Sequence, residues 1–540
     1  MDYNDKLYKA FLEAMNDLDN FRISYASEHT GISLDREDPD VRRLIEAMAF
    51  FSARTHIAGT KNITSARLRL FQQIFSFLLS PIPSMGILQA EITGHLQDKA
   101  EFPKGTEFVL KTDKGDAALY RTMEDLRILP IKQVGAKLIL LPSKGYRLMI
   151  RFGSMYKRRD EIERLSLHID YLNDYQNSLY VWDNLKTHVK SAFITFDERV
   201  DEHTKGTPCA VSFGNQSEKS SKADTEPLMH PIQESRFFFH FPSQDLFMHI
   251  DVPEMSKTWK QFTICLDLSE NWPAKLVVNK DIFVPFAVPV ENLKRAAAEP
   301  ILYDGTRERL PIYHPEKEAR YGLQEIVGVY KVADGVTTAL RPGVLAGGEG
   351  SYEVEYPQAS GKKNHAINLH YPEAFADPVT IVVDANWIQP AFSDRLNRRI
   401  TTKAYSRHVP GIKWRKRDNM VPHADNVFQE EMDVFIYLLS LRHKARFDYD
   451  DILTLLRVQG SVFKGSFKQI QRLFKGVEIE EARVQSASGS SLKYIYHLQF
   501  EKSSAYVRPM IKAFARQLEW MLDCWMSQAV VETKIKYLAS

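Results

Sequence analysis

The chain has 540 residues, which is enough for several domains of roughly 100–200 residues each. Its hydrophobic fraction of 44% and charged fraction of 26% are close to those of globular proteins, which excludes disorder as the main state of the chain. The 71 basic and 69 acidic residues leave a formal charge of +2, which excludes a chain built as a whole around nucleic acid or an anionic membrane surface.

The N-terminal region predicts three helices. Leu7, Phe11 and Met15 recur at four-residue steps and therefore share one face of the first helix. A second helix is expected to begin at Pro39, because proline at the first helical position loses no N–H that the helix needs. A third helix is expected over residues 68–78, and the prolines that follow end it.

After Ser84 the spacing of apolar residues changes from about 3.6 to 2, which is typical of strands. Half-buried strands are predicted at residues 148–152, 165–171, 262–268 and 352–356, and residues 380–383 form a short β-branched run. A helical insertion is expected near residues 178–189, and turn-rich tracts lie at 212–225 and 343–350. The middle of the chain is therefore expected to be mostly β.

The C-terminal region returns to helical spacing. Helices are predicted at residues 434–441 and 452–458, followed by a strand at 494–500. A final helix carries the apolar stripe Val507, Met510, Phe514, Leu518, Met521 and Trp525. Such a stripe forms either a core or a contact with another subunit, and its Met and Trp residues suit an adaptable interface, so we treat it as a candidate partner interface.

These patterns divide the chain into four regions. They are a helical region at 1–84, β-rich domains with a helical insertion at 85–290, a second β-rich domain with a basic segment at 291–425, and a helical or α+β region at 426–540. The predicted fold class is α+β, with helical N- and C-terminal regions around β-rich middle domains in an elongated multidomain scaffold.

Cysteine usage and the N-terminus predict a cytoplasmic protein. Cys209, Cys265 and Cys524 are far apart and odd in number, which argues against a disulfide framework or a zinc site. The N-terminus is mixed in charge, unlike a signal peptide. The most apolar stretch, residues 70–79, is too short and too polar to span a bilayer, so no direct membrane insertion is expected.

No motif predicts catalysis, a cofactor or a metal. The glycine-rich tract at 343–350 lacks the Gly-Lys-Ser/Thr ending of a phosphate-binding loop, and no Gly-x-Ser-x-Gly motif occurs. His365 and His370 lack the tight grouping of zinc ligands. A hydrolase would require paired carboxylates or a metal in a concave site, and the sequence displays neither signature. We therefore expect no enzyme activity.

One charged segment stands out, because no acidic residue interrupts residues 395–417. Its Lys and Arg residues are interleaved with Tyr405 and Trp414. This pattern suits binding to either a nucleic-acid backbone or an acidic protein partner. The protein partner fits the balanced charge of the chain better, and Arg415, Lys416 and Arg417 are the candidate contacts. A nucleic-acid-binding protein that uses this segment remains the alternative function.

Five stretches resemble, in the family's order, the TssF family (also called VasA or ImpG) of type VI secretion systems. They are residues 43–50 (RLIEAMAF), 81–89 (PIPSMGILQ), 103–106 with 120–126 and 129–130, 291–293 with 298–301, and 437–441 (YLLSL). The similarity covers almost the whole length, and the double-proline link from a helix into the first strand is its most specific part.

The chain resembles a divergent member of that family. Residues 77–80 (FLLS) replace the usual histidine and tyrosine before the double proline, and Lys294 stands where an aromatic residue is expected. Residues 384–390 (DANWIQP) keep only the asparagine and the final proline of the family's Cys-Thr-Asn-Arg-Asp-Leu-Pro run.

The resemblance implies a structural baseplate component of a contractile injection machine. Two copies of the chain would pair with one TssG-like subunit in a wedge, and six wedges would surround a VgrG-like spike hub. TssK-like adaptors would dock the baseplate at the inner membrane, and a TssE-like sheath initiator would join it to the sheath. Independently, the proline-rich link at Pro81, Pro83 and Ser84 predicts a stiff structural joint, because proline fixes φ and lacks an N–H.

Overall fold

The structure is a computed structural model in which two compact units are distinguished. One unit comprises Met1–Ser76, Ala297–Pro315 and Ile326–Ala385, and the other comprises Phe77–Ala296, Glu316–Glu325 and Asn386–Ser540. The structure describes all residues except 1–2, 30–37, 95, 160, 215–230, 255–257, 318–319, 344–349, 357–363, 372–376, 397, 406–407, 418–419, 427–431, 442–443, 461, 463–464, 487–488, 527–528 and 539–540. Most of the predicted turn tracts at 212–225 and 343–350 lies outside the described residues.

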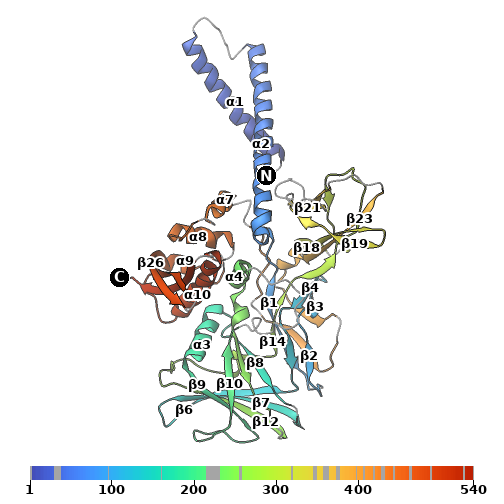
Figure 1. The fold of residues 1–540 in the computed structure, drawn as a ribbon. Helices are drawn as coiled ribbons and strands as arrows, with labels where there is room; N and C mark the ends of the chain where they lie inside the picture. The colour runs from blue at the N-terminus through green and yellow to red at the C-terminus, as the bar shows by residue number, and fades with distance from the viewer. Residues whose placement is uncertain are drawn as a thin grey trace. The chain divides into compact units, whose positions relative to one another are not determined.

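The first unit begins with two long helices, α1 (Tyr3–Glu28) and α2 (Pro39–Leu79). Figure 1 shows them running in opposite directions, drawn apart at the end where α1 stops and α2 begins. The expectation of separate second and third helices was wrong, because α2 runs without a break from Pro39 to a kink at Phe75, which lies inside the predicted third helix. No proline or glycine pair interrupts residues 40–79, so the backbone hydrogen bonds continue until a non-helical conformation at Phe75 (φ −136°, ψ 43°).

Two sheets contribute most of their residues to the first unit. One sheet contains β16 (Ile301–Tyr303), β23 (Val379–Ile388), β18 (Gly322–Ala333) and β19 (Val336–Ala339). A second sheet has the order β17 (Leu310–Pro311), β22 (Ala366–His370), β21 (Ser351–Glu355), β20 (Arg341–Pro342). Arg69 of α2 lies 3.4 Å from the buried carboxylate of Glu353 in β21, which fixes the helix to this sheet.

A closed six-stranded barrel forms the start of the second unit (Figure 1). Its order is β1 (Met85–Ile92), β14 (Ala287–Glu291), β4 (Ala117–Thr122), β3 (Glu107–Thr112), β24 (Ile400–Ala404), β25 (Ile412–Lys416), and β25 closes the barrel against β1. Alternate residues such as Phe108, Leu110 and Trp414 are buried, while their neighbours in the strands face outward. The closed sheet has no free edges. The pairing register therefore shows which residues of each strand point outward.

An eight-stranded antiparallel sheet follows. Its order is β13 (Phe283–Pro285), β8 (Arg164–Ile169), β11 (Phe247–Asp251), β10 (Thr207–Phe213), β9 (Val189–Phe196), β12 (Trp259–Leu268), β7 (Tyr146–Arg158), β6 (Lys132–Leu140). The helix α3 (Tyr175–His188), capped by Asp174, packs near β8. Half-burial was therefore the wrong expectation for β8 and β12, because His168 and Cys265 on the second faces are also buried.

The C-terminal part combines helices with a three-stranded sheet. Its elements are α7 (Met432–Leu441), α8 (Tyr449–Val458), α9 (Ile470–Leu473), β26 (Phe474–Ser486), β27 (Gly489–Phe500), α10 (Arg508–Trp525) and β28 (Ala529–Tyr537). The strands β27 and β28 are parallel, and α10 connects them as the crossover helix that a parallel pair requires. The strand β28 was not predicted from the sequence.

The remaining elements are short. They are β2 (Ala100–Phe102), β5 (Leu126–Ile128), α4 (Pro231–His240), η2 (Pro242–Asp245), η3 (Lys280–Ile282), β15 (Lys294–Ala297) and α6 (Pro390–Ser393). With helical regions at both ends and β-rich domains between them, the predicted α+β class is confirmed.

Candidate functional site

The segment after α2 leads into β1 of the barrel, and a second segment of the chain holds it. Ile82 and Ala424 exchange two backbone hydrogen bonds of 2.8 and 3.0 Å, and Met85 and Val421 exchange two of 3.1 and 2.7 Å. These antiparallel bridges fix the link over its whole length. We call residues 81–84 the joint and residues 421–426 the strap.

The joint's serine is buried and makes two hydrogen bonds. The Ser84 hydroxyl donates to the carbonyl oxygen of Val421 at 2.8 Å, and its oxygen lies 2.9 Å from the hydroxyl of Tyr120 in β4. Burial raises the pKa of Tyr120 well above its ordinary value, although the bond to Ser84 opposes the shift. Ser84 therefore ties the joint to both the strap and the barrel.

The last carbonyl groups of α2 are satisfied by side chains. A helix leaves its final carbonyl oxygens without partners inside the helix. Here the buried guanidinium of Arg236 donates to the carbonyl oxygens of Phe77 at 2.8 Å and Ser80 at 2.6 Å. Asn426 of the strap donates to the carbonyl oxygen of Leu79 at 2.7 Å. Because Arg236 lies in α4, the end of α2 is fixed to a different element.

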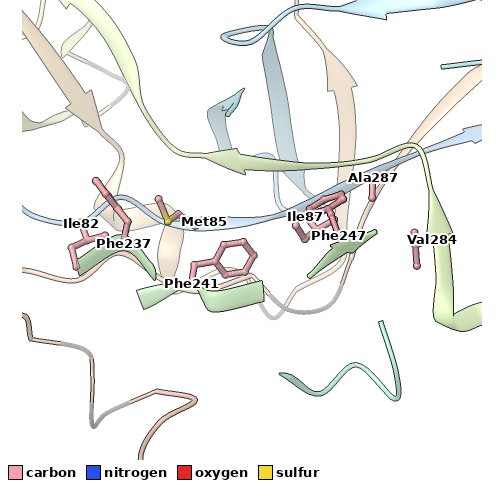
Figure 2. Packing of buried hydrophobic residues seen from close by; sticks show 8 residues of the cluster. All are labelled: Ile82, Met85, Ile87, Phe237, Phe241, Phe247, Val284 and Ala287. Atoms are coloured by element: carbon pink, nitrogen blue, oxygen red, sulfur yellow. The ribbon is translucent and has the colours of Figure 1, made fainter. Parts of the chain in front are cut away.

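Figure 2 shows the apolar cluster beneath the joint. It is built from the joint and β1, from the α4 region and β11, and from β13 and β14. Its residues are Ile82, Met85, Ile87, Phe237, Phe241, Phe247, Val284 and Ala287. The cluster therefore unites the barrel, the eight-stranded sheet and the joint in one core.

Burial also determines the charge states at the joint. It lowers the pKa of Arg236 to about 10, so the guanidinium remains charged at neutral pH. It lowers the pKa of the neighbouring His240 to about 4, and the charge of Arg236 shifts it in the same direction. His240 is therefore neutral at pH 7.

The helices α1 and α2 expose a large amount of apolar surface. Ten large apolar side chains on them are 41–66% exposed: Tyr8, Leu12, Phe21, Ile23, Leu44, Met48, Phe50, Phe51, Ile63 and Leu70. The stripe predicted for the first helix, Leu7, Phe11 and Met15, is only half-buried. Exposed large apolar side chains gathered on two helices are typical of an interaction site.

The C-terminal helix differs from α1 and α2. Of the six candidate interface residues on it, Met510, Phe514, Leu518 and Met521 are buried in the chain's own core. The ring centroid of Phe514, for example, lies within 6.3 Å of the ring centroids of Phe467, Phe474 and Phe500. Of the six stripe residues, only Val507 and Trp525 at its two ends are partly exposed. The stripe therefore packs within the chain, and a partner contact through it stays a prediction.

The candidate basic contacts are largely engaged within the chain. Arg417 forms an ion pair with the buried Asp170 of the eight-stranded sheet region, with Nε 3.1 Å from Oδ2. The ammonium of Lys416 donates to the carbonyl oxygen of Leu396 at 2.9 Å. Of the three candidates, only Arg415 keeps a mostly exposed side chain. Arg407, another base of the predicted segment, lies outside the described residues.

The tryptophan of the basic segment is part of the barrel core. The Trp414 ring packs edge-on against Phe108 and Phe102, with centroids 4.5 and 5.1 Å away. It is buried and so cannot stack on a base from outside. The arrangement does not support the alternative of a single-strand nucleic-acid site in this segment.

The described part of the chain offers neither a grouped metal-ligand set nor a membrane-spanning helix. Among those residues, no three or more His, Cys, Asp or Glu side chains are grouped so that they could hold a metal ion. No described helix combines the length and hydropathy needed to cross a membrane.

The strap, the barrel strand β4 and the helix α4 hold the joint and the end of α2, and the helices α1 and α2 expose apolar side chains. These two features define a scaffold-type subunit of a larger assembly. The family model of the type VI secretion system protein TssF matches residues 24–343, which is more than half of the chain. The chain therefore belongs to the TssF family, as its resemblance indicated.

Solved structures show the same fold. A chain of the type VI secretion system TssK-TssF-TssG baseplate subcomplex, determined by cryo-electron microscopy, superposes with a TM-score of 0.70 at 14% identity. The match covers 92% of this chain and 96% of that one. A chain of the baseplate complex from the type VI secretion system gives a TM-score of 0.59 at 14% identity over 98% and 96% of the two chains. No curated protein matches the sequence.

Proposed function

We propose that this chain is a structural subunit of a type VI secretion baseplate, which assembles with a TssG-like subunit through the exposed apolar surface of α1 and α2. The carrying observation is the set of ten exposed apolar side chains on these two helices. Leu44, Met48 and Phe51 illustrate the arrangement, because their spacing of four and three residues places them on one helical face. A subunit with such a face is complete only when a partner covers it.

The joint would hold the end of α2 in a fixed geometry. Hydrogen bonds from Arg236 and Asn426 bind the last carbonyl groups of this helix, and the strap holds the joint. A scaffold requires such a fixed connection more than it requires a concave pocket. Pro81, Pro83 and Ser84 are proposed to serve as this structural joint.

The wider assembly belongs to the same proposal. Two copies of the chain would bind one TssG-like subunit, and a TssK-like adaptor would dock the wedge at the inner membrane from the cytoplasm. Contacts with a TssE-like sheath initiator and a VgrG-like spike hub follow from the family resemblance. The protein would act by assembly and conformational triggering rather than by catalysis.

The test is co-expression with the TssG-like subunit of the same system, followed by size-exclusion chromatography with light scattering. We expect a complex of two copies of this chain and one partner. The triple variant Leu44→Lys, Met48→Lys, Phe51→Lys should abolish the complex, since three charges cannot be buried in an apolar contact.

The matched control is Val134→Lys with Leu140→Lys on the edge strand β6, which removes apolar side chains of similar exposure elsewhere. It should leave the complex intact. Wild-type chains that fold but never associate with the TssG-like subunit would overturn the proposed function. Equal loss in both variants would place the contact elsewhere than α1 and α2.

A further inference from the structure

The barrel's outer face carries a pair of lysines at opposed positions. The register pairs Thr402 of β24 with Trp414 of β25, and both side chains are buried inside the barrel. The next residue along each strand therefore points outward, which places Lys403 opposite Lys413. Both lysines are exposed.

Neighbouring strands add further basic side chains to this outer face. Thr401 of β24 pairs with Lys111 of β3, and Arg415 lies on the same outer face of β25 as Lys413. The strand β1 contributes the carboxylate of Glu91, which lies opposite Lys413 and 3.4 Å from the guanidinium of Arg415. We call Lys111, Lys403, Lys413 and Arg415 the basic barrel face.

This arrangement does not stabilise the barrel. Directly opposed residues of antiparallel strands have Cβ atoms about 4.5–5.5 Å apart, and like charges there are destabilising. Within the described residues, neither Lys403 nor Lys413 forms an ion pair. A negative group from outside the chain would relieve the repulsion.

We propose that the basic barrel face is a docking surface for an acidic segment of another protein in the assembly. Outward positions on the three adjacent strands β3, β24 and β25 present four cations, beside the carboxylates of Glu91 on β1 and Glu107 on β3. A partner with several Asp or Glu side chains is therefore electrostatically complementary. Tyr405 continues the face along β24, and its ring is 67% exposed. Exposed tyrosine is a frequent anchor of protein interfaces.

A nucleic acid fits the face less well. Single-strand sites need several aromatic rings on which successive bases stack. Of the two aromatic residues of this segment, Trp414 is buried against Phe102 and Phe108, which leaves Tyr405 alone exposed. Glu91 also places a carboxylate where a phosphate would lie. An acidic protein segment can direct its carboxylates to the lysines and avoid Glu91.

The test measures binding to the full-length chain by fluorescence anisotropy at low ionic strength. The probes are a fluorescein-labelled peptide rich in glutamate and, in parallel, labelled single-stranded DNA. We expect the peptide to bind and its affinity to fall as salt screens the charges. The double variant Lys403→Gln, Lys413→Gln should weaken peptide binding roughly fivefold, and Glu91→Gln should strengthen it.

The matched control is Lys132→Gln with Lys137→Gln, which removes two exposed lysines from the edge strand β6. It should leave peptide affinity unchanged. The proposal is overturned if the peptide does not bind, if the control weakens binding as much, or if DNA binds more tightly than the peptide at the same salt. Because no TssG-like subunit is present, the outcome is independent of the contact proposed for α1 and α2.

Discussion

The guanidinium of Arg236 is buried and donates a hydrogen bond of 2.6 Å to the carbonyl oxygen of Ser80, at the end of the longest helix of the chain. The same group reaches the carbonyl oxygen of Phe77. A charged donor thus binds oxygen atoms that the helix itself leaves without partners. Substituting Arg236 therefore measures how much the contact between α4 and the end of α2 contributes to stability.

Substituting Arg236→Met should lower the free energy of unfolding by about 2–4 kcal/mol, because buried carbonyl groups lose a charged donor. Arg236→Lys should lose less, since an ammonium retains the charge and can donate to two oxygens from one nitrogen, as Nη1 of Arg236 does here. Urea denaturation measures both. A methionine variant as stable as the wild type would contradict the role of Arg236 in holding the joint.

Substituting Ser84→Ala should cost about 1–3 kcal/mol, because the hydroxyl bonds both Val421 and Tyr120 in a buried site. Tyr120→Phe removes only one of these bonds and should cost less. A double-mutant cycle isolates the coupling between the two hydroxyls. Additive effects would show that the Ser84–Tyr120 contact contributes nothing of its own.

The buried His240 predicts a loss of stability in mild acid. Burial lowers its pKa from 6.5 to about 4 in the folded chain, so the unfolded chain binds the proton first as pH falls. Its contribution is fully present above pH 6.5 and declines towards pH 4 by up to about 1.4 kcal/mol per pH unit.

Glu124 acts in the opposite direction, since burial raises its pKa to about 7 and folding then favours its protonated form as pH falls. The comparison of wild type with His240→Asn therefore isolates the histidine. Unfolding free energies measured at pH 7.5, 5.5 and 4.5 should differ in slope between the two proteins. Parallel pH profiles would contradict the lowered pKa.

The triple variant Leu44→Lys, Met48→Lys, Phe51→Lys should fold normally and aggregate less in the absence of a partner. The three side chains are exposed, so their replacement should change stability by only about 0.5 kcal/mol. Thermal unfolding and light scattering measure the two properties. A large drop in stability would show that these residues belong to the chain's own core.

The single variant Lys403→Glu should raise stability by a few tenths of a kcal/mol, because it turns an opposed like-charge pair into an opposite-charge pair. It should also weaken binding of the glutamate-rich peptide. This combination, greater stability with weaker binding, distinguishes a functional surface from a structural one. Lower stability in the variant would contradict the register-based reading of the pair.

The sequence alone determined the family and most element types. The alternation at residues 262–268 and the helical spacing at 507–525 each correspond to an observed element, β12 and α10. Both predictions rest on local periodicity, so they do not require knowing which segment covers each face of the element. The stiffness expected of the joint likewise rests on local chemistry, because proline fixes φ and lacks an N–H.

Tertiary structure decided which surfaces are free. The stripes of α1 and α10 look alike in sequence, yet Phe514 is buried while Leu7, Phe11 and Met15 are only half-buried. The pairing of Lys403 with Lys413 and the reach of Arg236 to Ser80 join residues through register and through a contact between distant segments. Periodicity states which face of an element is apolar, but only the packing of distant segments determines whether that face is already covered.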